Sequence, residues 1–338
     1  MRSGILAAGN FIIDYVKIID TYPDQDTLAI ISAETASSGG GPYNVLKDLS
    51  AMGVAYPLEA AGLVGADANG KWILNDCAEA HIDTRQLRQC EDARAPTSYT
   101  DAMTVASTGR RTFFHQLGAN ALFSDEDLDF TRTNARHFHL AYLMLLDAMD
   151  SFVGGRTRAS LTLERARSAG LETSVDIVTS RNPQFREITE SALPYTCYLV
   201  LNEIEAGRAT GLELRPGGRI DLAVAEFAAK QLLAKGVEKQ VVIHFVEGAV
   251  LADGGGQVLL QGSLNLPQDF VAGATGAGDA FAAGYLHGVH ESWPTKLRLE
   301  LAVCCAAACL SHPTPSKGLA PVEDCLKLMP KYGVRDIG

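Results

Sequence analysis

A glycine-rich segment late in the chain carries the residue types best suited to chemistry. It runs from Gly273 to Asp279 (GATGAGD) and leads directly into an apolar stretch in which Phe281 and Tyr285 lie one helical turn apart. Such a loop before a helix presents unpaired backbone N–H groups and the positive end of the helix dipole, which bind an anion. A carboxylate at this place would repel a resting phosphate, so Asp279 is suited to accept a proton from an attacking hydroxyl. The alternative is that Asp279 merely caps the helix.

A second glycine-rich loop, Ser38 to Asn44 (SGGGPYN), precedes another predicted helix. The proline suits a first helical position, apolar residues follow at helical spacing, and Gly53 ends the helix. Bare backbone and an amide side chain suit neutral hydroxyl groups, so the loop is a candidate substrate site. A tight strand-to-helix turn without a ligand is the alternative.

Asp14 comes directly after a nearly continuous apolar run, Ile5 to Ile13, which predicts a central strand. The carboxyl ends of parallel strands are where open α/β sheets bind ligands, so Asp14 is a third candidate. A capping or surface aspartate is the alternative.

The elements that must position these residues follow from hydrophobic patterns. After residue 135, predicted strands at 138–146, 172–177, 198–201 and 240–245 alternate with helices through 161–169 and 222–235. This order predicts a largely parallel sheet. Short strands at 15–19, 27–35, 98–106 and 111–116, the last two joined as a hairpin at 107–110, predict a small separate sheet. We therefore expect one α/β domain with a small β insertion.

Composition and net charge indicate what kind of molecule the protein binds. The 338 residues are 47% hydrophobic and carry a formal net charge of −11, the wrong sign for a nucleic-acid surface or an anionic membrane. A small molecule is the expected partner, with no nucleic acid and no membrane. The apolar run Leu301 to Leu310 is too short to cross a bilayer, and no secretory signal is evident, so a cytoplasmic location is expected.

The cysteines point to the same compartment. There are seven, an odd number, without a C-x-x-C pair, which favours reduced thiols. Cys304, Cys305 and Cys309 lie at helical spacing in alanine-rich sequence and are expected in a helix core.

Together these motifs resemble the ribokinase (PfkB) family of sugar kinases. Gly39-Gly40 with Asn44 matches its N-terminal signature, and Thr275 to Asp279 matches its C-terminal one. Gly65 to Gly70 (GADANG) resembles its Gly-x-Asp-x-x-Gly turn, and Asn202 to Glu205 (NEIE) its Asn-x-x-Glu motif. The resemblance extends from about Ile5 to Leu328. It implies a ribokinase-like three-layer αβα sandwich with a mostly parallel central sheet, a single kinase domain over 1–338, and a β lid from segments about 14–37 and 97–117.

The resemblance also implies residue roles. Asp279 would be the general base, and the N–H groups of Ala277, Gly278 and Asp279 would form the anion hole, with Gly276 also among the catalytic residues. Glu205, with Asn202, would organise Mg²⁺ through water near the ATP phosphates. The expected substrate contacts are Asp14, Gly40, Gly41, Asn44 and Asp147. Thr275 and Gly248 are expected at the nucleotide. The lid would exclude water, and lid sheets would pair in a homodimer.

Three positions depart from the family pattern. Gly273 stands where many members have Asp or Asn, a residue that helps to hold a monovalent cation. Phe245 replaces the first glycine of a Gly-x-x-Gly stretch that lines the nucleotide, and Gly41 replaces the lysine of typical ribokinases, which leaves the sugar open.

The expected function is an ATP-dependent kinase that phosphorylates a hydroxymethyl group of a sugar or sugar-like polyol. A non-catalytic sugar- or nucleotide-binding regulator on the same fold is the alternative, motivated by Phe245 and Gly273. A nicotinamide-dependent oxidoreductase would need Gly-x-Gly-x-x-Gly directly after a strand, and no strand is predicted before Gly273.

Overall fold

A nine-stranded sheet forms the centre of the computed structural model, which describes residues 2–92 and 94–337. Its order is β15-β14-β13-β12-β11-β8-β1-β4-β5. The strands from β13 to β5 are parallel, and β14 and β15 are antiparallel additions at one edge. Their bounds are β1 Ile5–Gly9, β4 Leu58–Gly65, β5 Ile82–Cys90, β8 His137–Leu143, β11 Glu172–Ile177, β12 Tyr198–Asn202, β13 Gln240–Phe245, β14 Gly248–Asp253 and β15 Val258–Gly262.

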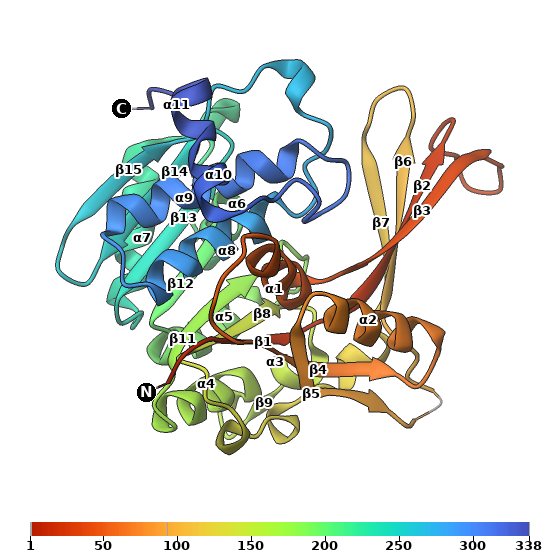
Figure 1. Cartoon of the computed structure of the whole chain (residues 1–338), viewed down its shortest axis with the longest axis horizontal. Helices are drawn as coiled ribbons and strands as arrows, with labels where there is room; N and C mark the ends of the chain where they lie inside the picture. The colour runs from red at the N-terminus through yellow and green to blue at the C-terminus, as the bar shows by residue number, and fades with distance from the viewer. Residues whose placement is uncertain (1, 93, 338) are drawn as a thin grey trace.

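Helices cover both faces of this sheet, which confirms the three-layer fold (Figure 1). One hydrophobic cluster packs the sheet against α1 Gly41–Ala51, α2 Ala68–Glu79, α8 Ala277–His290, α9 Thr295–Leu310, α10 Val322–Leu326 and α11 Leu328–Tyr332. The other packs it against α3 Asp147–Asp150, α4 Arg158–Ser168, α5 Phe185–Ala192, α6 Glu203–Thr210 and α7 Leu222–Ala234.

A separate four-stranded sheet projects from the body beside α1 and α2, and we call it the lid (Figure 1). Its strands, in spatial order, are β3 Ile31–Gly39, β2 Ile12–Ile19, β6 Tyr99–Val105 and β7 Arg111–Gln116. The predicted small sheet is therefore present, although β3 begins four residues later than the predicted strand, because residues 27–30 lie outside any strand. Short elements complete the chain: strands β9 Phe152–Val153 and β10 Arg156–Thr157, and 3₁₀ turns at Gly118–Leu122, Asp125–Asp127, Phe130–Arg132, Leu193–Tyr195, Pro216–Gly218 and Gln268–Phe270.

The predicted first strand, Ile5 to Ile13, is wrong as a single element. It ends as β1 at Gly9, and the chain then leaves the central sheet and enters the lid as β2 at Ile12. Gly9 has a φ of 140°, and a β-carbon there would lie 1.3 Å from the carbonyl oxygen of Ala141, so only glycine allows this exit. Asp14 therefore lies within a lid strand rather than at the end of a central strand.

The turn at Gly65 to Gly70 joins β4 to α2 and is hydrogen-bonded to the base of the lid. Asp67 caps α2 by accepting the N–H of Gly70 at 2.8 Å. It also accepts the N–H of Thr97 at 2.8 Å, two residues before β6 begins. The same carboxylate thus fixes the start of a helix and the base of a lid strand.

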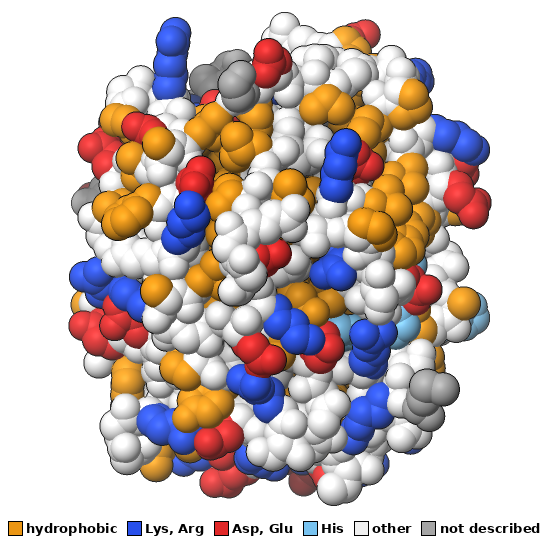
Figure 2. Space-filling view, turned by 90° about the vertical axis from the view of Figure 1, so that its left-hand side faces the viewer, with side chains coloured by type: hydrophobic (Ala, Val, Ile, Leu, Met, Phe, Trp, Pro, Cys, Tyr) orange, Lys and Arg blue, Asp and Glu red, His pale blue; other side chains and the backbone are white. Residues whose placement is uncertain are grey.

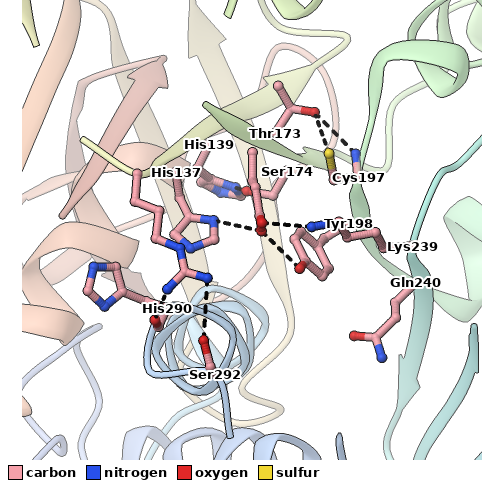
Figure 3. A network of polar contacts seen from close by, with 12 residues as sticks. His137, His139, Thr173, Ser174, Cys197, Tyr198, Lys239, Gln240, His290 and Ser292 are labelled. Carbon is pink, nitrogen blue, oxygen red and sulfur yellow. Dashed lines mark hydrogen bonds and ion pairs between the residues drawn. The ribbon is translucent and has the colours of Figure 1, made fainter. Parts of the chain in front are cut away.

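A polar network at the amino ends of the central strands holds the far end of α8 (Figure 3). Arg136 donates to the carbonyl oxygen of His290, the last residue of α8, at 2.7 Å. Nearby, Glu172 accepts hydrogen bonds from Lys239 and Tyr198. Because α8 is anchored here, its N-terminus is directed to the opposite end of the sheet.

Two composition-based expectations concern helices. No helix in residues 2–92 and 94–337 is both long enough and apolar enough to cross a membrane. Cys304, Cys305 and Cys309 are free and buried in α9, as predicted.

On the face shown in Figure 2, hydrophobic side chains lie scattered among lysine, arginine and acidic side chains.

Candidate active site

The glycine-rich segment of residues 273–279 forms the start of α8. Gly276 precedes the helix with a φ of 81°, and no side chain caps this end. The N–H groups of Gly278 and Asp279 in the first turn are therefore available to an anion, whereas the N–H of Ala277 makes a long hydrogen bond of 3.4 Å to the carbonyl oxygen of Ala274. Asp279 is the third residue of the helix and its side chain makes other contacts, so the alternative that it is only a cap is wrong.

Two side chains from distant parts of the chain donate hydrogen bonds to the Asp279 carboxylate. Asn44 Nδ2 on α1 donates to Oδ2 at 2.8 Å, and the hydroxyl of Tyr142 on β8 donates to Oδ1. Burial raises the pKa of Asp279 to about 6, although the bonds from Tyr142 and Asn44 oppose this rise. At neutral pH the carboxylate is ionised and close to the pKa that favours a general base.

Asp14 lies close to Asp279, although it comes from the lid. Burial, and secondly the charge of Asp279, raise the pKa of Asp14 to about 7. The side chain is half-buried, and a β-carbon at Gly39 of the neighbouring strand would lie 2.0 Å from its Oδ2. A half-protonated carboxyl both donates and accepts, which suits contacts with sugar hydroxyls.

The loop before α1 brings bare backbone and an amide to the same place. Gly40 has a φ of 97°, and a β-carbon there would lie 2.1 Å from the carbonyl oxygen of Asn10. The N–H of Gly41 donates to Asn10 Oδ1 at 3.3 Å. Asn44 is 5% exposed, and among the described residues its Oδ1 has no hydrogen-bond partner. The loop is thus a tight turn that also holds a buried acceptor oxygen without a partner among the described residues.

Asp147 is less closely connected to this cluster than the other predicted substrate contacts. It is the exposed first residue of α3 and makes no hydrogen bond in the part of the chain that the structure describes. Its charge raises the pKa of His115 on β7 of the lid, against the larger lowering by burial. His115 in turn lies 2.9 Å from Thr100, the strand neighbour of Asp14.

Asn202 and Glu205 form the reciprocal capping box of α6. Glu205 is 3% exposed and its carboxylate accepts from the N–H of Asn202 at 2.8 Å and from Thr179 Oγ1 at 2.8 Å. Burial raises the pKa of Glu205 to about 7, although these bonds oppose the rise. The pair is therefore more than a solvated helix start.

Asp176, at the end of β11, adds a second buried carboxylate. Burial, then the charges of Glu205 and Asp279, raise its pKa well above the usual range. No group of three or more His, Cys, Asp or Glu within the described ranges has the arrangement of a metal cage. Mg²⁺ does not need one, because it is usually held by one or two carboxylates with water and substrate phosphates. The oxygen donors of Glu205, Asn202 and Asp176 fit such an ion.

A cavity of about 500 Å³ lies on the other side of the α8 N-terminus. Apolar side chains of α8, α9 and the β15–α8 connection dominate its lining, and Gly248, Ala277 and Gly278 also border it. His244 borders it with its ring tilted by 32° against that of Phe281 at a centroid distance of 5.0 Å, and burial lowers the pKa of His244 to about 4, so the ring is neutral. Such a cavity fits a flat heteroaromatic group whose phosphates reach the helix N-terminus.

The structure gives physical reasons for two of the residues that depart from the expected motif pattern, Phe245 and Gly273. Successive strand residues alternate between faces, and the Phe245 side chain belongs to the hydrophobic cluster on the α6–α7 face rather than to the cluster of Phe281. Its ring is thus part of the core, although Phe245 borders the cavity. A β-carbon at Gly273 would lie 2.8 Å from Pro313 Cα, so a larger residue would need the backbone to move. Thr275 is partly exposed, and its carbonyl oxygen accepts from Cys309 Sγ at 3.4 Å.

Sequence reasoning missed Tyr142, Asp176 and His244. Asp176 lies at the carboxyl end of a predicted strand, a position that could have marked it. Tyr142 lay inside a predicted strand without any polar motif, and His244 lay inside another.

Comparisons with known proteins identify the family of the chain. Residues 5–321 match the pfkB family carbohydrate kinase pattern. An ATP-dependent ribose-1-phosphate kinase of Halopiger xanaduensis is 27% identical over 326 residues, covering 95% of this chain and 96% of that protein. The structure of Arabidopsis thaliana ribokinase complexed with ribose and ATP superposes with a TM-score of 0.80 at 22% identity, covering 97% and 99% of the two chains. A fructokinase from Xylella fastidiosa with bound ATP has a TM-score of 0.74 at 18% identity, covering 98% and 99%.

A family match of this extent defines the class of protein. The chain belongs to the pfkB family of carbohydrate kinases, and it is an enzyme that phosphorylates a sugar with ATP. The resemblance seen in the sequence motifs is thereby confirmed.

Proposed function

We propose that this enzyme transfers the γ-phosphoryl group of ATP to a hydroxymethyl group of a sugar or sugar-like polyol, with Asp279 as general base. The observation that carries the proposal is the position of Asp279, a buried carboxylate in the first turn of a helix whose N–H groups are uncapped. Base and anion site thus lie within one helical turn.

The acceptor binds between the lid and the body. Asp14 of the lid and Oδ1 of Asn44, which lacks a partner among the described residues, hold its hydroxyls together with the backbone at Gly40 and Gly41. Asp279 takes the proton of the reacting hydroxyl, and the oxygen attacks the γ-phosphorus. The N–H groups of Ala277, Gly278 and Asp279 stabilise the charge that develops on the phosphoryl oxygens.

The nucleotide occupies the cavity beside α8. Its base packs among apolar side chains near Phe281 and His244, with Thr275 and Gly248 close to it, and its phosphates reach the helix start. Glu205 and Asn202 would hold Mg²⁺ through water, with the carboxyl group of Asp176 nearby. The ion neutralises charge on the phosphates when bound.

The four-stranded lid excludes water from this reaction and pairs with the lid of a second copy. Its apolar side chains support this arrangement, because Leu28, Ile30 and Phe113 are 82%, 62% and 60% exposed. Leu28 and Ile30 precede β3 at one edge of the lid and Phe113 lies on β7 at the other, and exposed apolar side chains at sheet edges are normally covered in the assembled protein. The whole chain then acts as one kinase domain with its lid inserted.

The test is ADP release with Mg²⁺ and a panel of sugars, polyols and nucleosides, with mass spectrometry of the product. We expect acceptor-dependent ADP release and a product heavier by one phosphoryl group. Tight binding of an acceptor and of ATP, with no turnover on any acceptor, would instead support a non-catalytic regulator.

A further inference from the structure

The hydroxyl of Tyr142 contacts the carboxylate of the proposed base. Tyr142 lies on β8, is half-buried, and donates its hydroxyl to Oδ1 of Asp279, 137 residues further along the chain. Burial and the charge of Asp279 raise the pKa of Tyr142 well above its usual range. The phenol therefore stays protonated and remains a hydrogen-bond donor at every pH at which the enzyme works.

The absence of a side chain at Gly41 leaves space for the ring of Tyr142. A β-carbon at Gly41 would lie 2.8 Å from Tyr142 Cε1 and 2.9 Å from the β-carbon of Ala141. Any side chain at position 41 would push the tyrosine ring away from Asp279. Gly41 and Tyr142 are therefore complementary, with the ring of one filling the space that the other leaves.

We propose that Tyr142 is a positioning residue of the phosphoryl transfer, whose hydroxyl orients the Asp279 carboxylate toward the acceptor and favours its charged form. This inference rests on the proposed function of Asp279. Each carboxylate oxygen can accept two hydrogen bonds, so the bonds from Asn44 and Tyr142 leave room for the acceptor hydroxyl. A hydrogen bond to the charged form lowers the pKa of a carboxyl and so opposes burial.

The surroundings make this donor hard to replace. The titratable or polar groups that face Asp279 from neighbouring elements are Asp14 of β2, Asn44 and Asp48 of α1, Tyr142 of β8, Asp176 of β11 and Cys309 of α9. None of these groups is a cation, and any of the three carboxyl groups that is ionised disfavours a further negative charge on Asp279. Loss of the phenol hydroxyl would therefore go uncompensated.

The test compares Tyr142→Phe with a matched control, Tyr198→Phe. Tyr198 also donates its hydroxyl to a carboxylate, Glu172 at 3.0 Å, but at the opposite end of the sheet (Figure 3). In Tyr142→Phe we expect the acidic limb of kcat/KM to move up by about one pH unit. The rate would fall about fivefold at pH 6 and recover to within about threefold of wild type at pH 8. In Tyr198→Phe the pH profile should not move.

A second readout does not depend on turnover. Titration of ¹³C-labelled aspartate, with Asp279 assigned from Asp279→Asn, should show the same upward shift of the Asp279 pKa in Tyr142→Phe. If wild type phosphorylates no acceptor, the proposed function fails, while this titration still decides the role of Tyr142.

An unmoved Asp279 titration in Tyr142→Phe would overturn the inference, as would an equal loss of rate at every pH. If Tyr142→Phe does not fold, Gly41→Ala displaces the ring from the other side, and the same upward shift is expected. An unchanged pKa of Asp279 in folded Gly41→Ala would then reject the proposal.

Discussion

Replacing Asp279 with asparagine separates chemistry from structure at the proposed base. Asparagine keeps the shape of the side chain and can still bond both neighbours, with its oxygen toward Asn44 Nδ2 and its amide toward Tyr142, whose hydroxyl turns to accept. It cannot take a proton. Removal of a general base costs on the order of 10²- to 10⁴-fold in rate, or about 2.7–5.4 kcal/mol of barrier.

The same substitution has a predictable effect on stability. The pKa of Asp279 rises from 3.8 to about 6 in the folded protein, which costs roughly 3 kcal/mol once the group is ionised. Because the folded state binds the proton more tightly, stability falls as pH rises through the window between these two values. Asp279→Asn should therefore be at least as stable as wild type at pH 8, and this advantage should shrink toward pH 4.

The assay is single-turnover quench-flow with saturating ATP and acceptor, calorimetry for acceptor affinity, and thermal unfolding at pH 8 and pH 5. Asp253→Asn is a matched control, because Asp253 accepts the N–H groups of Gly255 and Gln257 beyond the amino end of β13. We expect lost turnover, nearly intact affinity and undiminished stability at pH 8. A loss of turnover below about tenfold, with chemistry rate-limiting, would refute Asp279 as the base.

The remaining predictions concern the acceptor, the cation and the lid. Asp14→Ala should raise the KM for the acceptor by about 5- to 150-fold, because a lost partner in a site built for hydroxyls costs about 1–3 kcal/mol; an unchanged KM would remove Asp14 from the site. Exchanging potassium for a large inert cation at constant ionic strength should change the initial rate little. Gly273 supplies no ligand, and neutral backbone carbonyls alone should hold potassium weakly. A rise above about tenfold on adding potassium, or about 1.4 kcal/mol, would contradict this. Sedimentation at micromolar concentration should show a dimer that Phe113→Ser weakens, whereas a single species of 36.0 kDa in wild type would reject lid pairing.

Hydrophobic patterns predicted the second half of the fold well. Strands β11 and β13 have the predicted bounds, because buried parallel strands are short apolar runs between clear breakers. The prediction of one strand over Ile5 to Ile13 was wrong, because the side chains are apolar and buried both in the central sheet and at the base of the lid. Only the backbone conformation of Gly9 marks the point at which the chain leaves the central sheet.

Part of the candidate site could also be predicted from the sequence. Asp279, Asn44 and Asp14 could be found because glycine-rich loops and strand ends mark them, and the structure brings all three together. Tyr142 could not be found, since its contact with Asp279 depends on how β8 and α8 pack. The deep burial that sets the pKa of Asp176 is likewise a property of the folded chain.

The central claim is that Asp279 deprotonates the acceptor hydroxyl while the start of α8 holds the phosphoryl group. A crystal structure with a non-hydrolysable ATP analogue, Mg²⁺ and the acceptor identified by turnover tests it most directly. The account predicts the reacting hydroxyl within about 2.6–3.2 Å of an Asp279 carboxylate oxygen and the γ-phosphate on the N–H groups of residues 277–279. A γ-phosphate bound away from this helix start, or a reacting hydroxyl directed at another carboxylate such as Asp176, would contradict it.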